Sequence, residues 1–451
     1  MARKQKSVSD LSRREILKYG LYGGLAAGLA GIPRLGSCGK KRQGETPDII
    51  LISIDSLRPD HLGCYGYQRQ TSPTIDRIAQ EGVRFTNAVS TTPWTLPSYA
   101  ALFTGLYDSA HGLVDNGLRL AKAHLTLAEV LCRAGYQTAG FFGGPYLHST
   151  FGFDKGFMTY QSCMTALSDN ASDEVVRWQS RKNVSVSHAD ITGPRTLEKF
   201  SSWLKKAGER PMFVFLHMWD VHYDYIPPRQ YVDMFDPDYI GSVSAKNFMR
   251  NNAVHAHMSE RDLQHVIALY DGEVRFTDDI LADILAELDR YGRMEQALIL
   301  VTADHGEEFF EHGGKGHART LYDEVIRVPL IFRWLNHLRE AVVVEQQVRL
   351  IDVMPTILSL AGVPLNAKIQ GRDISGLLRG EKISEKSAFC ELLLDKRRDR
   401  ALRTNQKKVW VNGLTKVRMC FDLLNDPGER KPLMSISSEF QQALAELAAT
   451  A

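Results

Sequence analysis

The sequence predicts an α/β protein with a mostly parallel central sheet and helices on both faces, followed by a small C-terminal α+β subdomain. Short apolar runs of strand length recur along the 451 residues, and segments with helical periodicity lie between them. The pattern loosens after about residue 365, where turn signals become frequent. Because strands that alternate with helices are typical of parallel sheets, we expect one large unit at 47–365 and a subdomain at 366–451.

The first 38 residues are predicted to be an export signal. The basic stretch 12–18 contains Arg13-Arg14 and resembles a twin-arginine signal, and the apolar run 19–32 that follows is too short to span a membrane. Leu35-Gly36-Ser37-Cys38 resembles a lipoprotein processing box. We expect export to the periplasm or the outer face of the cell membrane, with Cys38 as a lipid anchor and 39–46 as a linker. A simple cleaved signal, with Cys38 incidental, is the alternative.

The composition is that of a soluble globular protein, with 44% hydrophobic and 24% charged residues. The formal net charge is only +2, and the short basic runs 40–42 and 396–398 are interpreted as solvated surface. This balance argues against a nucleic-acid partner. None of the six cysteines forms a C-x-x-C spacing, and the sequence does not assign disulfides.

The predicted elements follow one another in strand–helix order. Strands are expected at 48–55, 138–142, 212–216, 297–302 and 329–332, and helices at 72–81, 97–104, 125–134, 195–206 and 261–291. The polar segments 164–194 and 229–260 are predicted to be lids or substrate-binding insertions. In the subdomain, 407–411 and 416–422 indicate a hairpin with Asn412-Gly413 as its turn, and 438–449 a closing helix.

Chemistry-bearing residues stand where predicted strands end. Asp55 ends the first apolar run, and Asp304-His305 follow the run 297–302. Ligand sites in α/β sheets lie at the carboxyl ends of strands, where Asp55 would lie, and an adjacent Asp-His pair at a strand end is a candidate pair of metal ligands. Imidazole favours zinc or manganese over calcium, although calcium is possible.

A helix N-terminus near Thr95 is a candidate oxyanion site. Thr95 is predicted to cap a helix with Pro97 in its first turn, and such a terminus presents a positive dipole end. By itself this is an ordinary capped helix.

The stretch 95–105 resembles the sulfatase signature C/S-x-P-S-R-x-x-L-x-T-G. Pro97, Ser98, Leu102, Thr104 and Gly105 match. Thr95 stands where the family has the cysteine or serine that becomes formylglycine, and Tyr99 replaces its arginine. The resemblance therefore implies no formylglycine. It implies instead a threonine nucleophile that also binds the metal, as in related phosphodiesterases and phosphoethanolamine transferases, with Tyr99 at a substrate-contact position.

Other segments resemble the family in chain order from about 47 to 430. Asp304-His305-Gly306-Glu307 resembles its D-H-G-E motif, so the resemblance implies one divalent metal on Asp55, Asp304, His305 and Thr95. His317, twelve positions after His305, is expected to contact the ester or leaving group, and Lys315 is the second candidate for that contact. His222 matches the histidine that touches the oxyanion, whereas His217 is interpreted as a neutral core histidine.

Three functions remain open at this point. The threonine and the Asp-His pair favour hydrolysis of phosphate mono- or diesters, or phosphoryl transfer. The overall resemblance favours sulfate-ester hydrolysis. A non-catalytic binding lipoprotein is disfavoured because three metal ligands are present. In each case the expected partner is a small-molecule, lipid or glycan ester.

Overall fold

The computed structural model describes residues 46–165, 190–433 and 438–449. The predicted signal 1–38, Cys38 and nearly all of the linker lie outside the described residues, as does most of the segment 164–194. The described residues belong to one unit that runs from Thr46 onward. Within it, no helix has both the length and the apolar character needed to cross a bilayer.

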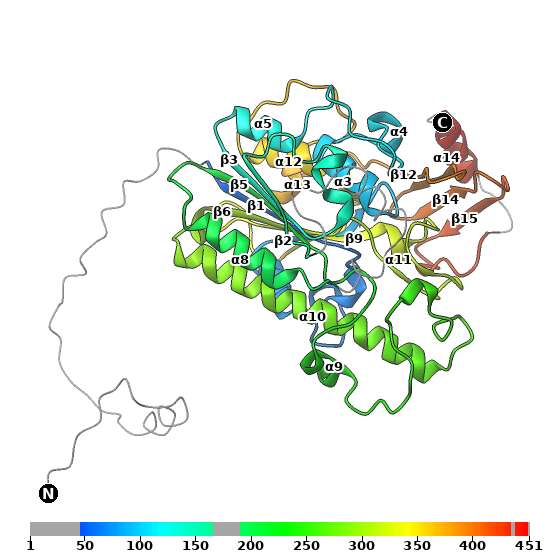
Figure 1. Ribbon diagram of the computed structural model, residues 1–451. Coiled ribbons are helices and arrows are strands. Elements are labelled where there is room, and N and C mark those ends of the chain that lie inside the picture. Colours follow the sequence, from blue (N-terminus) through cyan, green and yellow to red (C-terminus); the bar gives the residue numbers. More distant parts are fainter. Residues whose placement is uncertain (1–45, 166–189, 434–437, 450–451) are drawn as a thin grey trace, which may run out of the picture. The chain divides into compact units, whose positions relative to one another are not determined.

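A nine-stranded, mostly parallel sheet forms the centre of this unit (Figure 1). The strand order is β10-β2-β9-β6-β1-β5-β3-β4, and β11 also pairs with β2. The bounds are β1 Asp48–Ile54, β2 Val83–Val89, β3 Gln137–Phe142, β4 Thr159–Ser162, β5 Met212–Met218, β6 Ala297–Thr302, β9 Arg327–Arg333, β10 Val342–Val344 and β11 Val348–Arg349. Every residue of β1, β5 and β6 is buried, which explains why these strands read as continuous apolar runs.

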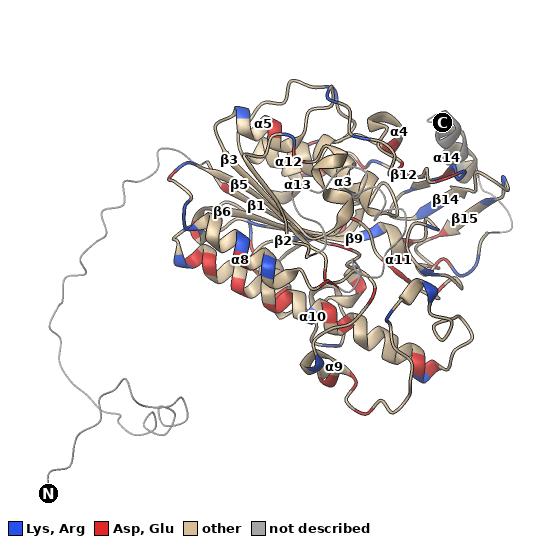
Figure 2. Cartoon of the chain, in the orientation of Figure 1, with Lys and Arg blue, Asp and Glu red and all other residues tan. Residues whose placement is uncertain are grey.

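Helices cover both faces of the sheet, as predicted (Figure 1). The face with α8 Gly193–Leu204 and the long α10 Glu260–Arg290 also has α2 Pro73–Gln80, which packs on α10. The opposite face has α3 Thr95–Thr104, α5 Leu127–Arg133 and α12 Val353–Leu360, which contact one another. Acidic and basic residues are interspersed along α8 and α10 (Figure 2).

The C-terminal part adds a separate four-stranded antiparallel sheet, which confirms the predicted α+β subdomain. Its strands are β12 Ala388–Leu392, β13 Asp399–Arg403, β14 Lys407–Val411 and β15 Arg418–Asp422, and α14 Ser438–Ala449 packs on β13 and β14. The remaining α-helices in the described part of the chain are α4 Asp108–His111, α9 Arg229–Phe235, α11 Asp323–Ile326 and α13 Ser375–Leu378, and the short hairpin β7 Glu308–Phe309 and β8 Lys315–Gly316 follows β6.

Several details differ from the sequence-based expectations. Strand β9 runs antiparallel to β2 and β6. The half-buried β2 was not predicted, because its alternating burial gives no continuous apolar run. The segment 229–260 is partly helical, since α9 packs on α10. The β14–β15 turn spans 412–417 rather than two residues, because the Asn412 side chain accepts the backbone N–H groups of Leu414 and Thr415.

Candidate active site

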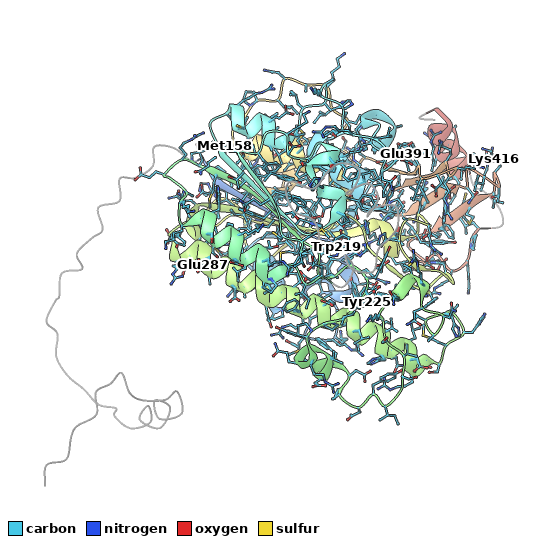
Figure 3. The ribbon with its side chains drawn as sticks, in the orientation of Figure 1. Met158, Trp219, Tyr225, Glu287, Glu391 and Lys416 are labelled. Atoms are coloured by element: carbon cyan, nitrogen blue, oxygen red, sulfur yellow. The ribbon has the colours of Figure 1, made fainter. Side chains whose placement is uncertain are left out.

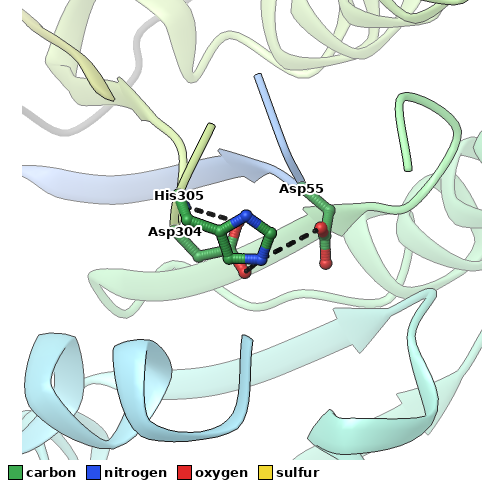
Figure 4. Close-up of side chains that lie close together, drawn as sticks. All are labelled: Asp55, Asp304 and His305. Carbon is green, nitrogen blue, oxygen red and sulfur yellow. Dashed lines mark hydrogen bonds and ion pairs between the residues drawn. The ribbon is translucent and has the colours of Figure 1, made fainter. Parts of the chain in front are cut away.

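Two central strands bring Asp55, Asp304 and His305 together. Strands β1 and β6 are parallel neighbours, and Ser53 is in register with Thr302, so the residues that follow them share one edge of the sheet. One ligand atom from each of the three side chains lies within 4.8 Å of the others, and all three residues are buried. Figure 4 shows the carboxylates and the imidazole facing one another. The strand-end prediction placed these three residues correctly.

Hydrogen bonds fix the orientation of this cluster. Oδ1 of Asp304 accepts the backbone N–H groups of Ser56 (3.2 Å) and His305 (2.9 Å). The Nδ1 atom of His305 lies 2.9 Å from the carbonyl oxygen of Gly306, so Nδ1 carries the hydrogen and Nε2 presents its lone pair. Nε2 lies 3.3 Å from Oδ2 of Asp304 and 3.8 Å from Oδ1 of Asp55.

The electrostatics of the cluster favour a bound cation. Burial and the charge of Asp55 raise the pKa of Asp304 well above its ordinary value. Burial would also raise the pKa of Asp55, but the contact with His217 and the nearby imidazoles outweigh it and lower that pKa below its usual range. Among the described residues, no lysine or arginine forms an ion pair with either carboxylate, and Oδ2 of Asp304 is buried without a hydrogen-bond partner.

These observations fit a divalent metal. Two carboxylates and one imidazole lone pair are a suitable donor set for zinc or manganese. The hydrogen bond from Nδ1 of His305 to a backbone carbonyl is the usual outer contact of a metal-binding histidine.

Thr95 lies against this cluster. Its Oγ1 is 3.2 Å from Nε2 of His305 and 3.5 Å from Oδ2 of Asp55. The prediction that Thr95 caps the helix was wrong: α3 begins at Thr95 itself, Trp94 is the N-cap residue, and no side-chain cap bond forms. Ser98 Oγ donates to the carbonyl of Asp304 (2.7 Å) and ties α3 to the end of β6. The threonine hydroxyl is therefore left facing the cluster.

His317 lies beside His305, and His222 lies beside His317. The ring centroid of His317 is 4.2 Å from that of His305 and 4.9 Å from that of His222. Nδ1 of His317 is 3.1 Å from Oε1 of Glu307. His222 stacks on Trp219 with 3.9 Å between ring centroids. The structure thus brings both predicted histidines to the site.

The two predicted substrate contacts do not join this group. Tyr99 points into the core: it is fully buried, and its hydroxyl bonds Oγ of Ser53 at 2.8 Å. Lys315 points away, because its Nζ donates to the backbone carbonyls of Asn251 (3.1 Å) and Val254 (2.6 Å).

Two further residues at the site were not predicted. His217, interpreted as a core histidine, has Nε2 3.4 Å from Oδ2 of Asp55, and its Nδ1 accepts the backbone N–H of Gly143. The β1–β5 register places His217 beside Ser53, two residues before Asp55, and no local sequence signal reveals this pairing. Glu307 is fully buried, accepts the hydroxyl hydrogen of Tyr225 (2.9 Å), and has its pKa raised to about 8 by burial.

Comparisons with known proteins bear on the family of this chain. The family model described as "Sulfatase" matches residues 47–363, and one described as "N-sulphoglucosamine sulphohydrolase, C-terminal" matches residues 311–450. The chain is 25% identical over 352 residues to the ulvan-active sulfatase of Formosa agariphila, a match that covers 74% of this chain and 65% of that protein.

Two solved structures share the fold. A protein solved in complex with its substrate D-glucosamine-2-N,6-O-disulfate gives a TM-score of 0.73 at 19% identity, over 90% of this chain and 96% of that one. The phosphonate monoester hydrolase of Agrobacterium radiobacter gives a TM-score of 0.71 at 22% identity, again over 90% and 96%.

Proposed function

Because the chain belongs to the sulfatase family, we propose that it is a metal-dependent ester hydrolase that uses Thr95 as its nucleophile and acts on phosphate mono- or diesters. One observation carries the proposal: the Thr95 hydroxyl is within 3.5 Å of both His305 and Asp55, in a buried cluster with the donor set of one divalent metal. An unmodified threonine there supports a hydroxyl nucleophile rather than an aldehyde hydrate.

The metal is expected to bind to Asp55, Asp304 and His305, with the Thr95 hydroxyl as a further ligand. A divalent ion in such a site lowers the pKa of a bound hydroxyl and offsets negative charge in the transition state. Thr95 Oγ1 releases its hydroxyl proton to water and attacks the phosphorus or sulfur atom in line, and the bond to the alcohol oxygen breaks. Thr95 opens α3, so the positive end of the helix dipole lies where charge develops.

The histidines supply the proton transfers. His317 donates a proton to the leaving oxygen, and Glu307 beside its Nδ1 orients the ring. His222 holds a non-bridging oxygen of the ester. Water, or an acceptor alcohol in a transferase, then gives a proton to His317 and attacks the phosphothreonine or sulfothreonine, and the bond to Thr95 Oγ1 breaks.

Sulfate-ester hydrolysis is the second candidate, favoured by the family to which the chain belongs. The two are separated by assaying the metal-loaded protein against nitrophenyl sulfate, nitrophenyl phosphate and bis-nitrophenyl phosphate. We expect the highest kcat/KM for a phosphorus ester. A sulfate ester preferred by tenfold or more contradicts the phosphate assignment, and no turnover of any of the three contradicts the hydrolase assignment.

Export and a lipid anchor complete the proposal. The signal-like sequence around Arg13-Arg14 and Cys38 supports export to the periplasm or the outer face of the membrane. Replacing both arginines with lysine is expected to leave the precursor in the cytoplasm, as measured by cell fractionation. Cys38→Ala is expected to release the protein from membranes, and unchanged membrane association contradicts the lipid anchor.

A further inference from the structure

A second group of side chains that can bind a metal lies beside the hairpin that follows β6. It consists of Glu308 at the start of β7, His312 in the turn between β7 and β8, and Glu324 in α11. One ligand atom from each of the three lies within 4.8 Å of the others. Only 1% of Glu308 is exposed, and the other two residues are partly buried. This hairpin cluster has the same donor set as the active site, namely two carboxylates and one imidazole.

The surroundings of His312 direct one ring nitrogen at the carboxylates. Its Nε2 lies 3.1 Å from the backbone carbonyl oxygen of Glu429, which can only accept, so Nε2 carries a hydrogen and Nδ1 holds the lone pair of the neutral ring. Nδ1 lies 2.7 Å from Oε1 of Glu324, and the ring stacks on Tyr322 with 3.5 Å between ring centroids. A lone pair and a carboxylate oxygen at this distance repel each other unless a cation lies between them. That cation is a proton or a metal ion.

A proton on Nδ1 would leave Glu308 without a cation. Its Oε1 accepts the backbone N–H groups of His312 (3.2 Å) and Gly314 (2.8 Å), and among the described residues none donates a hydrogen bond to Oε2. Burial and the charge of Glu324 raise the pKa of Glu308. In the described part of the chain, no lysine or arginine forms an ion pair with either glutamate. A divalent ion would neutralise both carboxylates, which one proton cannot do.

Other carboxylates in the same region have cations of their own. Glu311, on the same hairpin, lies against Arg58. Glu429, whose carbonyl oxygen faces the imidazole of the hairpin cluster, pairs with Lys408 at 2.8 Å. The lack of a basic partner is therefore a property of the two glutamates in the hairpin cluster and not of the region as a whole.

We propose that Glu308, His312 and Glu324 bind a second divalent metal ion, such as zinc, which fixes the β7–β8 hairpin to α11. Two carboxylates and one imidazole suit such an ion, and the hydrogen bond from Nε2 of His312 to a backbone carbonyl is the usual outer contact of a metal-binding histidine. The ion takes the place of any proton on Nδ1, which is released to water. The backbone N–H of Glu307 already donates to the carbonyl of Glu324 at 3.0 Å, so the ion strengthens an existing contact.

The hairpin connects this ion to the catalytic residues. Glu307 directly precedes β7, and His317 directly follows β8. Tyr225, which Figure 3 labels, donates its hydroxyl hydrogen to Glu307 from the segment after β5. An ion in the hairpin cluster therefore restrains the segment that joins Glu307 to His317. Its consequence for proton transfer rests on the proposed function, whereas the metal site itself does not.

Metal content tests the proposal without any turnover. The purified protein is loaded with zinc and freed of excess metal, and its zinc content is measured by plasma mass spectrometry. We expect two ions per chain in wild type and one in each of Glu308→Gln and Asp304→Asn, because each change removes a charged ligand from one site. Glu287→Gln is the matched control and keeps both ions, because Glu287 lies near the end of α10, far from α11 (Figure 3).

The same measurements distinguish a metal ion from a proton. Fewer than two ions per chain in wild type, or two ions in Glu308→Gln, would overturn the proposal and leave His312 and Glu324 as a protonated ion pair. If Glu308→Gln does not fold, cobalt titration of Asp304→Asn with and without His312→Ala decides. One bound equivalent that depends on His312 supports the second site, and no such equivalent overturns it. Neither result depends on whether Thr95 cleaves an ester.

Discussion

The metal-site cluster of Asp55, Asp304 and His305 and a second group of buried charges differ in how their charge is neutralised. The second group, the junction cluster, consists of Asp323, Glu429, Arg403 and Lys408, and it connects α11 to the C-terminal sheet. Here Arg403 Nη2 lies 2.6 Å from Asp323, and Lys408 Nζ lies 3.1 Å from Asp323 and 2.8 Å from Glu429. Both clusters are deeply buried, but only the junction cluster contains its own cations.

The difference separates structural charge from functional charge. Carboxylates that have arginine and lysine partners need no bound cation. In the junction cluster they hold α11 and the C-terminal sheet together. Carboxylates that lack such partners remain unfavourable until a cation binds. Among buried acidic groups, those without a basic partner are therefore the better candidates for a metal or substrate site.

The largest expected effect is on catalysis. Thr95→Ala should lower turnover by about 10³-fold or more, because the covalent route is lost while the metal ligands remain. Steady-state rates and the metal content of the purified variant measure this. Thr95→Ser should keep part of the activity, and mass spectrometry of the wild-type peptide should show an unmodified threonine. Near-native turnover in Thr95→Ala would mean that Thr95 is not the nucleophile.

Stability is expected to respond most strongly at the junction cluster. Arg403→Met leaves Asp323 with one buried partner fewer and should lower the free energy of unfolding by about 3–5 kcal/mol, with metal content unchanged. Denaturant titration gives the change. The exposed Arg398→Met is the control and should cost less than about 0.5 kcal/mol. A loss of metal in Arg403→Met would contradict the claim that the junction cluster stabilises the fold independently of the metal site.

Metal binding to the metal-site cluster should stabilise the protein. At a free metal concentration 100-fold above Kd, the expected gain in the free energy of unfolding is about 2.7 kcal/mol. Thermal unfolding with and without a chelator measures it. Asp304→Asn should lower the measured gain by this amount, whereas the exposed Asp289→Asn should keep the full gain. An equal gain in Asp304→Asn would place the metal elsewhere.

The smallest expected effect is on the free energy of unfolding at low pH. Burial would raise the pKa of Asp323, but Arg403 and Lys408 outweigh it and lower that pKa far below 3.8. The lowered pKa means that the Asp323 carboxylate stabilises the folded protein above about pH 4, and that this stabilisation is lost as the pH falls below about 4. We expect wild type to lose on the order of 1–2 kcal/mol more than Asp323→Asn between pH 5 and 3. Parallel pH profiles for the two proteins would contradict this.

The sequence predicted the positions of the strand ends better than the directions of the side chains. The apolar runs located the strand ends at Asp55 and Asp304-His305, and the resemblance to the sulfatase family grouped the three residues as ligands of one metal. Tyr99 and Lys315 were misplaced because a motif position does not reveal whether a side chain turns inward to Ser53 or outward to the 251–254 carbonyls.

Long-range pairing explains the other omissions. The antiparallel direction of β9 depends on which strands it meets, and this has no local signal. The contact between His217 and Asp55 depends on the β1–β5 register, which links segments more than 160 residues apart in sequence.

The order of strands in the sheet also has a kinetic consequence. Ser56 and Asp304, joined by a hydrogen bond, are 248 residues apart in sequence, so the two halves of the metal site meet only after β6 has paired with β1. Closing so long a loop comes late compared with local helix formation. Metal uptake during refolding therefore reports when the centre of the sheet is complete. A chain released from its ribosome or chaperone before β6 has paired with β1 would not bind the ion.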